Sequence, residues 1–366
     1  MRTRPPVLVT IAILVGAGLV IGLGLLTFGV TATVGPRGLP LAVAVPDGAA
    51  APLQQAAQRV VEQGGEQVSW RLTSPAEARR LLDEKAVYGV LELASGAPAT
   101  VVLSGAVNPN AAQAAQQVLA PAAQAASAGT GQPVTQTVHP ASAPERTAPL
   151  AAATLLWAGT LGGTALLVAL GSGPGRRTTV ALRLAVAIGV TVAATAVVLA
   201  LMALWDWSLL DRGLRVDSRL IGFLLLTGLG FAAVQGAVLR LLGMTGMSIF
   251  GPLYLMAPVV AGQVPELMHP AYRVLLWSWT PIRFPAEGLR SLLLLDSAPD
   301  LRTAVWVVAG MAVVGMVGLL WPSRRQPAPD GAASAGDTGD TGDTGDAAGA
   351  DGAAAGKAVP VAASAA

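Results

Sequence analysis

Side chains capable of covalent or metal chemistry are scarce in this sequence. The 366 residues include no cysteine and two histidines, His139 and His269. The absence of cysteine excludes disulfides, thiolate nucleophiles and cysteine-ligated metals. Glu266 and His269 form a single E-x-x-H pattern, whereas a zinc site usually takes three or four protein ligands. We therefore predict that both histidines lie in loops and that the chain holds no metal.

Nucleotide-binding and hydrolase motifs are also missing. The sequence has no G-x-x-x-x-G-K-[ST], H-E-x-x-H or G-x-S-x-G pattern. The glycine-rich residues 171–178 (GSGPGRRT) lack both the spacing and the lysine of a phosphate-binding loop, so they predict a tight connection. The chain is thus not expected to be an enzyme, to use a cofactor or to hydrolyse ATP by itself.

Long apolar stretches, almost free of charge, dominate the sequence and predict six transmembrane helices. They cover residues 7–34, 150–170, 184–204, 220–239, 241–264 and 303–321. At about 1.5 Å per helical residue, the first is longer than the ~30 Å hydrocarbon core of a bilayer. A cleaved signal peptide is the alternative there, although its apolar region usually has about 7–15 residues. A composition with 53% hydrophobic and 12% charged residues and a mean hydropathy of +0.60 is typical of a polytopic α-helical membrane protein.

Basic residues indicate the orientation in the membrane. Arg2 and Arg4 precede the first stretch, so the positive-inside rule places the N-terminus in the cytoplasm. An even number of crossings returns the C-terminus to the same side, where Arg176 and Arg177 would lie. Frequent Ala, Gly and Arg with few Lys suggest a bacterial source and hence the plasma membrane. The net charge of +2, without a dense basic cluster, argues against nucleic-acid binding.

Polar side chains inside the predicted spans are candidates for a substrate pathway. The span interiors contain no Asp, Glu, Lys, Arg or His, which argues against proton- or ion-coupled transport. The remaining polar candidates are Gln235, Tyr254 and Gln263. For Gln235 a hydrogen bond between helices is favoured over substrate contact. Prolines 252 and 258 are expected to break or kink the fifth span.

Residues 265–302 predict a re-entrant or interfacial hairpin before the last span. The segment is apolar enough to enter lipid, but its prolines and charges make a full crossing improbable. Trp277 and Trp279 are expected at the level of the lipid headgroups. Arg283, Glu287 and Arg290 are expected at an exposed outer surface, with the last two paired on one helix face. The hairpin would be either a plug over the outer mouth of a pathway or a passive cap that shields helix ends.

Residues 35–148 predict a small extracytoplasmic α/β domain between the first and second spans. Its expected strands are residues 41–45, 67–72, 87–93 and 100–103, and its expected helices are residues 51–63, 75–85 and 108–126. This β-α-β-α-β-β-α order indicates a mainly parallel sheet. Residues 127–149 are expected to be a linker to the five-helix membrane domain, residues 149–322. The acidic repeat after it places residues 323–366 in a disordered cytoplasmic tail.

Three local segments carry a resemblance to a known family. They are LAVAVPDG at residues 41–48, SPAEARRLLDEKAVYGVLEL at residues 74–93 and WTPIRFPAEGLR at residues 279–290. Together with the layout of residues 1–322, they resemble the ABC-2 type permeases, in particular the YhgE/Pip-like branch.

This resemblance implies an export pore formed by two permease halves, a homodimer or heterodimer, and driven by a separate ATPase subunit. Arg176 and Arg177 would then contact the ATPase, and the cargo would be a hydrophobic or amphipathic compound. The alternative is a non-transporting envelope protein, a receptor or secretion accessory whose external domain binds a partner.

Overall fold

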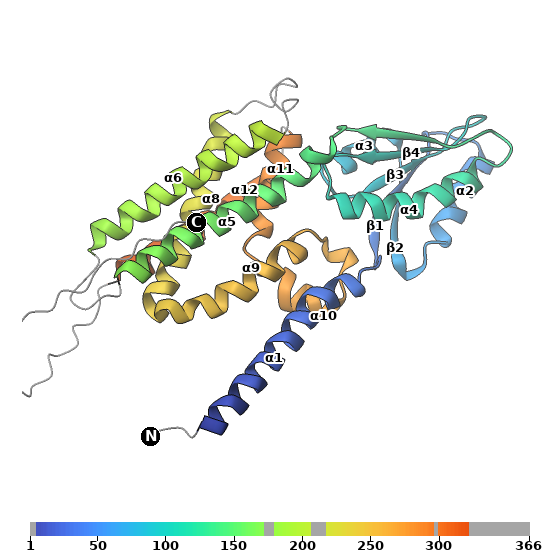
Figure 1. The fold of residues 1–366 in the computed structure, drawn as a ribbon. Helices are drawn as coiled ribbons and strands as arrows, with labels where there is room; N and C mark the ends of the chain where they lie inside the picture. The colour runs from blue at the N-terminus through green and yellow to red at the C-terminus, as the bar shows by residue number, and fades with distance from the viewer. Residues whose placement is uncertain (1–4, 172–178, 206–216, 296–298, 322–366) are drawn as a thin grey trace, which may run out of the picture. The chain divides into compact units, whose positions relative to one another are not determined.

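The computed structural model describes residues 5–171, 179–205, 217–295 and 299–321, which form an α/β part and a helical part (Figure 1). Arg176, Arg177 and the predicted tail, residues 323–366, lie outside the described residues.

The α/β part is built on a five-stranded sheet. Its strands are β1 (Leu39–Ala44), β2 (Val68–Thr73), β3 (Gly89–Glu92), β4 (Thr100–Ser104) and β5 (Val134–Val138). They lie in the order β2-β1-β3-β4-β5, and every pair is parallel except the antiparallel β3–β4 pair. The predicted β-α-β-α-β-β-α succession and the mainly parallel sheet are confirmed, with β5 as an additional strand.

Helices cover both faces of this sheet. They are α2 (Ala51–Glu62), the short 3-10 turn η1 (Gly65–Gln67), α3 (Pro75–Asp83) and α4 (Pro109–Ala126). Strand residues alternate between the faces: Leu41 and Val43 pack with residues of α2 and α4, while Ala42 and Ala44 pack with α3. The period-2 pattern of apolar residues thus produces a three-layer arrangement.

Strand β5 corrects the prediction of a linker over residues 127–149. Val134–Val138 (VTQTV) pairs in parallel with β4, and α5 begins at Ala143 rather than near residue 150. Four of the five β5 residues are exposed, so the strand has no apolar face that would mark it in the sequence. Backbone pairing, rather than side-chain burial, places it in the sheet.

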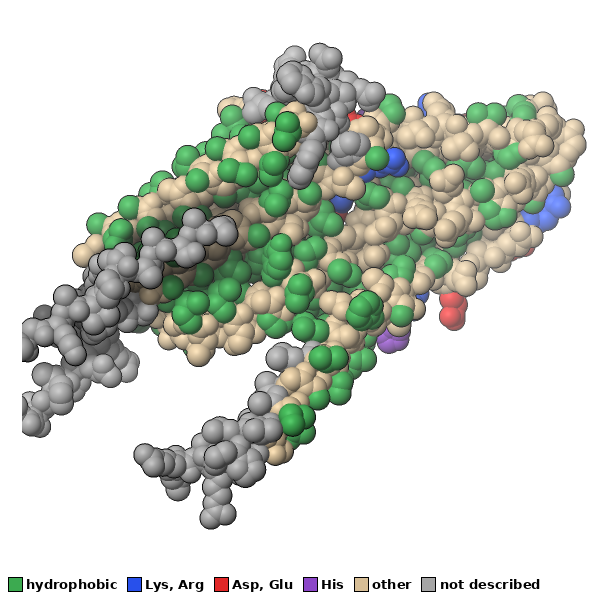
Figure 2. Space-filling view, in the orientation of Figure 1, with side chains coloured by type: hydrophobic (Ala, Val, Ile, Leu, Met, Phe, Trp, Pro, Cys, Tyr) green, Lys and Arg blue, Asp and Glu red, His purple; other side chains and the backbone are tan. Residues whose placement is uncertain are grey.

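The helical part contains long apolar helices joined by shorter pieces. The long helices are α1 (Pro5–Ala32), α5 (Ala143–Gly171), α6 (Val180–Trp205), α8 (Ser218–Leu242), α9 (Met247–Ala261) and α12 (Pro299–Leu320). Four helical stretches among the described residues are long and apolar enough to cross a membrane: 145–170, 180–204, 218–261 and 300–320. Figure 2 shows hydrophobic side chains over these helices, as expected for a polytopic helical membrane protein.

Small residues bring these helices together. A Cβ atom built on Gly315 of α12 would lie 2.5 Å from the Ala233 backbone of α8, and one on Gly163 of α5 would lie 2.4 Å from the Val190 side chain of α6. Such contacts let backbones approach closely where no aqueous hydrophobic effect drives association. Aromatic side chains pack in the core of the helical part. The centroids of the Trp157 and Phe231 rings lie 4.8 Å apart, and the rings meet edge to face.

The segment from Gly243 to Leu294 differs from its prediction in two respects. After the 3-10 turn η2 (Gly243–Gly246), α9 continues through Pro252 and Pro258, so of the predicted break or kink the break is wrong. The predicted hairpin consists of η3 (Pro265–Leu267), α10 (Pro270–Tyr272), the π-helical turn η4 (Arg273–Trp277) and α11 (Arg283–Leu294). α11 packs into the bundle, because a Cβ on its Gly288 would touch Phe223 of α8 and Ala304 of α12.

Among the side chains that the structure describes, those of helix α1 that meet other helices lie near its C-terminal end. There Val30 is buried with Met256 and Val260 of α9, and the Tyr272 hydroxyl donates a hydrogen bond to the Leu25 carbonyl at 3.0 Å. Farther toward the N-terminus, a Cβ atom built on Gly18 or Gly22 would have nothing within 4 Å. The apolar surface of α1 therefore stays open to lipid or to a second chain.

Candidate functional site

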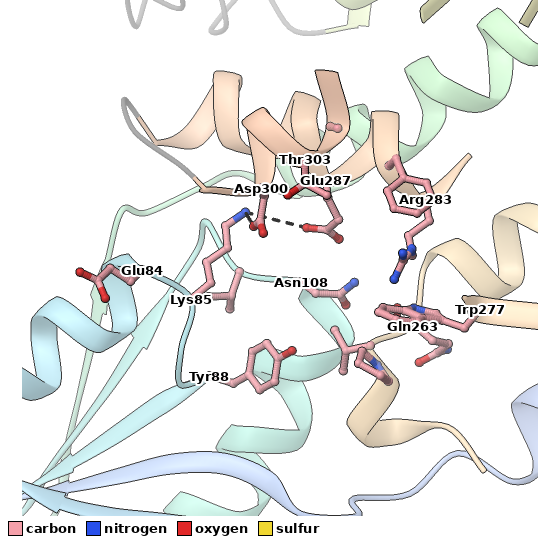
Figure 3. Close-up of a pocket in the computed structure, with 15 residues that line it drawn as sticks. Glu84, Lys85, Tyr88, Asn108, Gln263, Trp277, Arg283, Glu287, Asp300 and Thr303 are labelled. Carbon is pink, nitrogen blue, oxygen red and sulfur yellow. Dashed lines mark hydrogen bonds and ion pairs between the residues drawn. The ribbon is translucent and has the colours of Figure 1, made fainter. Parts of the chain in front are cut away.

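A cavity of about 270 Å³ lies where the α/β part meets α11, α12 and the segment after α9 (Figure 3). The α/β part contributes Lys85, Tyr88 and Asn108 to its wall; the helical part contributes Gln263, Trp277, Arg283, Glu287 and Asp300. Its position between two structural parts and its mixture of aromatic and charged groups make it the candidate functional site.

Lys85 connects the two parts across this cavity. It follows α3 in the left-handed backbone region, with φ of 55°, and its side chain is only 11% exposed. Its ammonium group donates to Ser291 Oγ and Asp300 Oδ2, each at 3.0 Å, and lies 3.8 Å from Glu287 Oε2. One cation from the α/β part thus neutralises two carboxylates of the helical part.

Tyr88 forms a second polar link. It precedes β3, and its hydroxyl donates a hydrogen bond to Glu266 Oε2 at 3.1 Å. Burial raises the pKa of the Tyr88 hydroxyl, and the nearby Glu266 carboxylate raises it further. Tyr88 therefore remains a neutral hydrogen-bond donor over the physiological pH range.

Arg283 begins α11 and lies between two aromatic rings. Its guanidinium carbon is 3.5 Å from the centroid of the Trp277 ring and 4.2 Å from that of Phe284. The Trp277 indole is itself held by a 3.1 Å hydrogen bond to the Gln263 carbonyl. Burial lowers the pKa of Arg283, while Glu287 and Asp300 act in the opposite direction. Within the described part of the chain, Arg283 Nε and the Gln263 side-chain oxygen are buried without a hydrogen-bond partner.

The Glu287–Arg290 pair is confirmed, but its expected exposure is wrong. Arg290 Nη1 donates to Glu287 Oε1, and Arg290 is only 2% exposed, because α11 packs against α5, α8 and α12 instead of lying at an open surface. Burial alone would raise the pKa of Glu287, but Arg290 and Lys85 outweigh it, so the pKa lies below its usual range. Glu287 is therefore charged at neutral pH and is shared between two cations.

The segment after α9 also fixes the α/β part to the helices. Asn108 Nδ2 and Asn110 Nδ2 both donate to the Gly262 carbonyl, at 3.1 and 2.9 Å. Val264 and Leu267 are buried in the core between the sheet and α2 and α4. Residues from the helical part therefore complete the core of the α/β part.

The other predicted site residues lie apart from the cavity or at its edge. Gln235 is fully buried in α8 and donates to the Trp157 carbonyl of α5 at 3.0 Å, which confirms the hydrogen bond between helices. Tyr254 is 38% exposed on α9 and Trp279 is 52% exposed after η4. Of the three pathway candidates, the structure brings only Gln263 into the cavity.

Sequence reasoning missed the contribution of the α/β part and of Asp300. One signal was available for Lys85: the chain contains only two lysines, and the other is Lys357 near the C-terminus. No comparable signal marks Tyr88, Asn108 or Asp300, whose roles depend on tertiary contacts.

The histidines do not join this cavity. His139 Nε2 lies 3.0 Å from Asp83 Oδ1, and the His269 side chain accepts a hydrogen bond from the Ala271 amide at the start of α10. Within residues 5–171, 179–205, 217–295 and 299–321, no three His, Cys, Asp or Glu side chains are grouped to bind a metal ion. The cavity combines ion pairs with aromatic faces, which suits binding and the joining of the two parts.

Comparison of the chain with protein-family models, with curated proteins and with solved structures finds no match.

Proposed function

We propose that this chain is the membrane-spanning permease subunit of an ABC-2 type exporter, which moves a hydrophobic or amphipathic compound out of a bacterial cell. A separate ATPase supplies the energy, and two permease chains form the pathway. The observation that carries this proposal is the cavity at the junction of the α/β part and the helices, in whose wall Lys85 pairs with Glu287 and Asp300. These ion pairs join the two parts and can exchange partners when cargo leaves.

Helix directions support six crossings. The apolar stretch at residues 218–261 contains 44 residues, which at about 1.5 Å per residue is roughly twice the thickness of the hydrocarbon core. It divides at Gly243, where φ is 61°, and α9 then returns so that Gly262 contacts Asn108 of the α/β part. Together with α1, α5, α6 and α12, this return supports the proposal of six spans, an even number that keeps both termini on one side of the membrane. The proposed topology has both termini in the cytoplasm, as the basic residues before the first apolar stretch suggest, and the α/β domain outside.

A non-transporting envelope protein is the second candidate function. The sheet ends in β2 and β5, each of which pairs with one neighbour among the described strands. An open strand edge can accept an extended segment of a partner by β-augmentation. In this case the α/β domain is a receptor or secretion-accessory module that the helices anchor.

Copurification separates the two functions. The tagged full chain is extracted from its native membranes in mild detergent, and its partners are identified by mass spectrometry. An exporter subunit brings with it a chain that has a Walker A motif and hydrolyses ATP in the purified complex. Recovery of an envelope protein without such an ATPase would favour the second function.

A matched pair of variants refines this test. Replacing Arg176 and Arg177 by Gln is expected to release the ATPase, since both lie in the connection predicted to face the cytoplasm. Arg212→Gln, in a connection predicted to face outward, should retain it. Equal retention by both variants would exclude the connection of residues 171–178 as the ATPase contact.

A further inference from the structure

A second cavity, of about 540 Å³, lies beside the first and has a different character. It is formed where the start of α4, the first turns of α5, the end of α9 and α11 meet. Its wall is mostly apolar and includes Leu150, Ala151, Leu155 and Pro258. This volume lies within the range of about 300–1,000 Å³ that is usual for small-molecule sites.

Two arginines line this mostly apolar cavity, as do the polar residues Asn110, Thr147 and Thr154. Arg290 is 2% exposed, and its Nη1 is engaged by Glu287, but its Nε is buried without a partner among the described residues. An unmade hydrogen bond from a buried charged group is costly, so the guanidinium of Arg290, which lines the cavity, is suited to an acceptor supplied by a ligand. Arg146 on α5 lines the same cavity, and its side chain is exposed.

Nearby acidic groups are already engaged. Glu287 is shared by Arg290 and Lys85, and the Glu145 carboxylate accepts a hydrogen bond from the Ser142 amide near the start of α5. The cavity therefore combines two guanidinium groups with a mostly apolar wall. A cationic ligand would be repelled by the arginines, and a neutral hydrocarbon would offer no acceptor to the Arg290 guanidinium.

We propose that this cavity binds an anionic single-chain amphiphile, with its head group at Arg290 and Arg146 and its alkyl chain against α5 and Pro258. The head group is a carboxylate or a phosphate, the two acceptors whose geometry an arginine fork matches. The site is distinct from the Lys85 cavity and does not depend on the export function, because it follows from the cavity wall and the two arginines alone.

Direct binding to the full chain in nanodiscs of neutral phosphatidylcholine tests this proposal. The probe is 11-(dansylamino)undecanoic acid, whose fluorescence rises in an apolar site, and empty nanodiscs provide the background. Saturable binding to the protein is expected. Dodecanoate or dodecyl phosphate should displace the probe, and the stronger of the two identifies the head group. Dodecanol and dodecyltrimethylammonium should not displace it.

Substitutions in the cavity wall test separately the contribution of the arginine charge and that of the apolar volume. Arg146→Gln should weaken binding on the order of tenfold, and Arg71→Gln, at an exposed arginine of the edge strand β2, should leave it unchanged. Ala151→Trp fills the apolar wall at an exposed position, and it should abolish saturable binding without lowering the melting temperature.

Three results would overturn the proposal: equal displacement by the neutral and cationic competitors, unchanged affinity of Arg146→Gln, or binding no greater than that of empty nanodiscs. None of these results depends on an ATPase. The binding assay can therefore contradict the proposed site without contradicting the export function, and copurification can contradict the export function without contradicting the site.

Discussion

At the scale of single residues, the most consequential group is Lys85. Its side chain is the cation from the α/β part that meets both Glu287 and Asp300. We expect Lys85→Gln to lower stability by about 1–3 kcal/mol, because two carboxylates in a partly buried site lose their counterion. The thermal unfolding midpoint of the full chain in nanodiscs measures this loss.

Arg80→Gln is the matched control for that variant. Arg80 is paired with Glu77 and Glu84 on an exposed face of α3, where solvent screens the interaction. Its substitution should leave the midpoint almost unchanged. If both variants melt like the wild type, Lys85 does not hold the two parts together.

Glu287 gives this contact a defined pH dependence. Its pKa is lower in the folded protein than the ordinary value of about 4.3 in an unfolded chain, so its charged form adds stability above that value. This stability is lost as the pH falls through the lowered pKa. The difference in melting temperature between the wild type and Glu287→Gln should therefore be largest at pH 6–7 and should shrink below about pH 4.

Glu62→Gln, at the exposed end of α2, is the control for the pH series. It should show a small difference at every pH. A wild-type advantage over Glu287→Gln that persists or grows below pH 4 would contradict the role assigned to the charged carboxylate.

At the scale of elements, the parallel packing of α8 and α12 depends on glycine. A Cβ atom on Gly315 would lie 2.5 Å from backbone atoms of Ala233 and Val234, whereas one on Gly310 would meet nothing within 4 Å. Gly315→Ala should therefore force the helices apart and lower the melting temperature. Gly310→Ala should be neutral or stabilising by up to about 1 kcal/mol, since alanine favours the helix. Equal effects of the two substitutions would show that this contact is not tight.

The helices and strands also show which features of the fold sequence patterns could and could not predict. Apolar runs and alternation predicted the strands β1 to β4 and most helices, because burial on one face or in lipid leaves a periodic signal. β5 left none, since its side chains are mostly exposed. The burial of α11 was not predicted either. Arg290 was expected at the surface because it is charged, but it is buried, since its pairing with Glu287 compensates its charge.

The candidate cavity was accessible to sequence reasoning on one side only. Trp277, Arg283 and Glu287 occupy a single segment and could be grouped by spacing. Lys85 and Tyr88 reach them across about 200 residues of chain, and Asp300 lies beyond α11. No local pattern encodes such contacts, which follow from the docking of the α/β part on the helices.

At the scale of the whole molecule, the prediction to test first is the membrane topology, with the α/β domain outside the cell and both termini in the cytoplasm. The absence of native cysteine allows single cysteines to report the side of the membrane. Ala97→Cys, in an exposed loop between β3 and β4, should react with a membrane-impermeant maleimide in intact cells. Ser334→Cys should react only after the cells are opened. The reverse pattern would place the α/β domain in the cytoplasm and exclude the proposed export orientation.

The burial of Val264 and Leu267 within the α/β core has a consequence for biosynthesis. The strands and helices of the α/β domain are complete once Val138 has been made, but the core lacks these two residues until much later. At about 5–20 residues per second, the roughly 130 residues up to Leu267 take about 6–26 s to synthesise. In the proposed topology the domain is translocated, and during that interval it exposes an apolar gap that a chaperone outside the membrane can shield. Completion of the domain is thereby coupled to insertion of α9, so a chain that fails to insert its later helices leaves an open core that proteases can recognise.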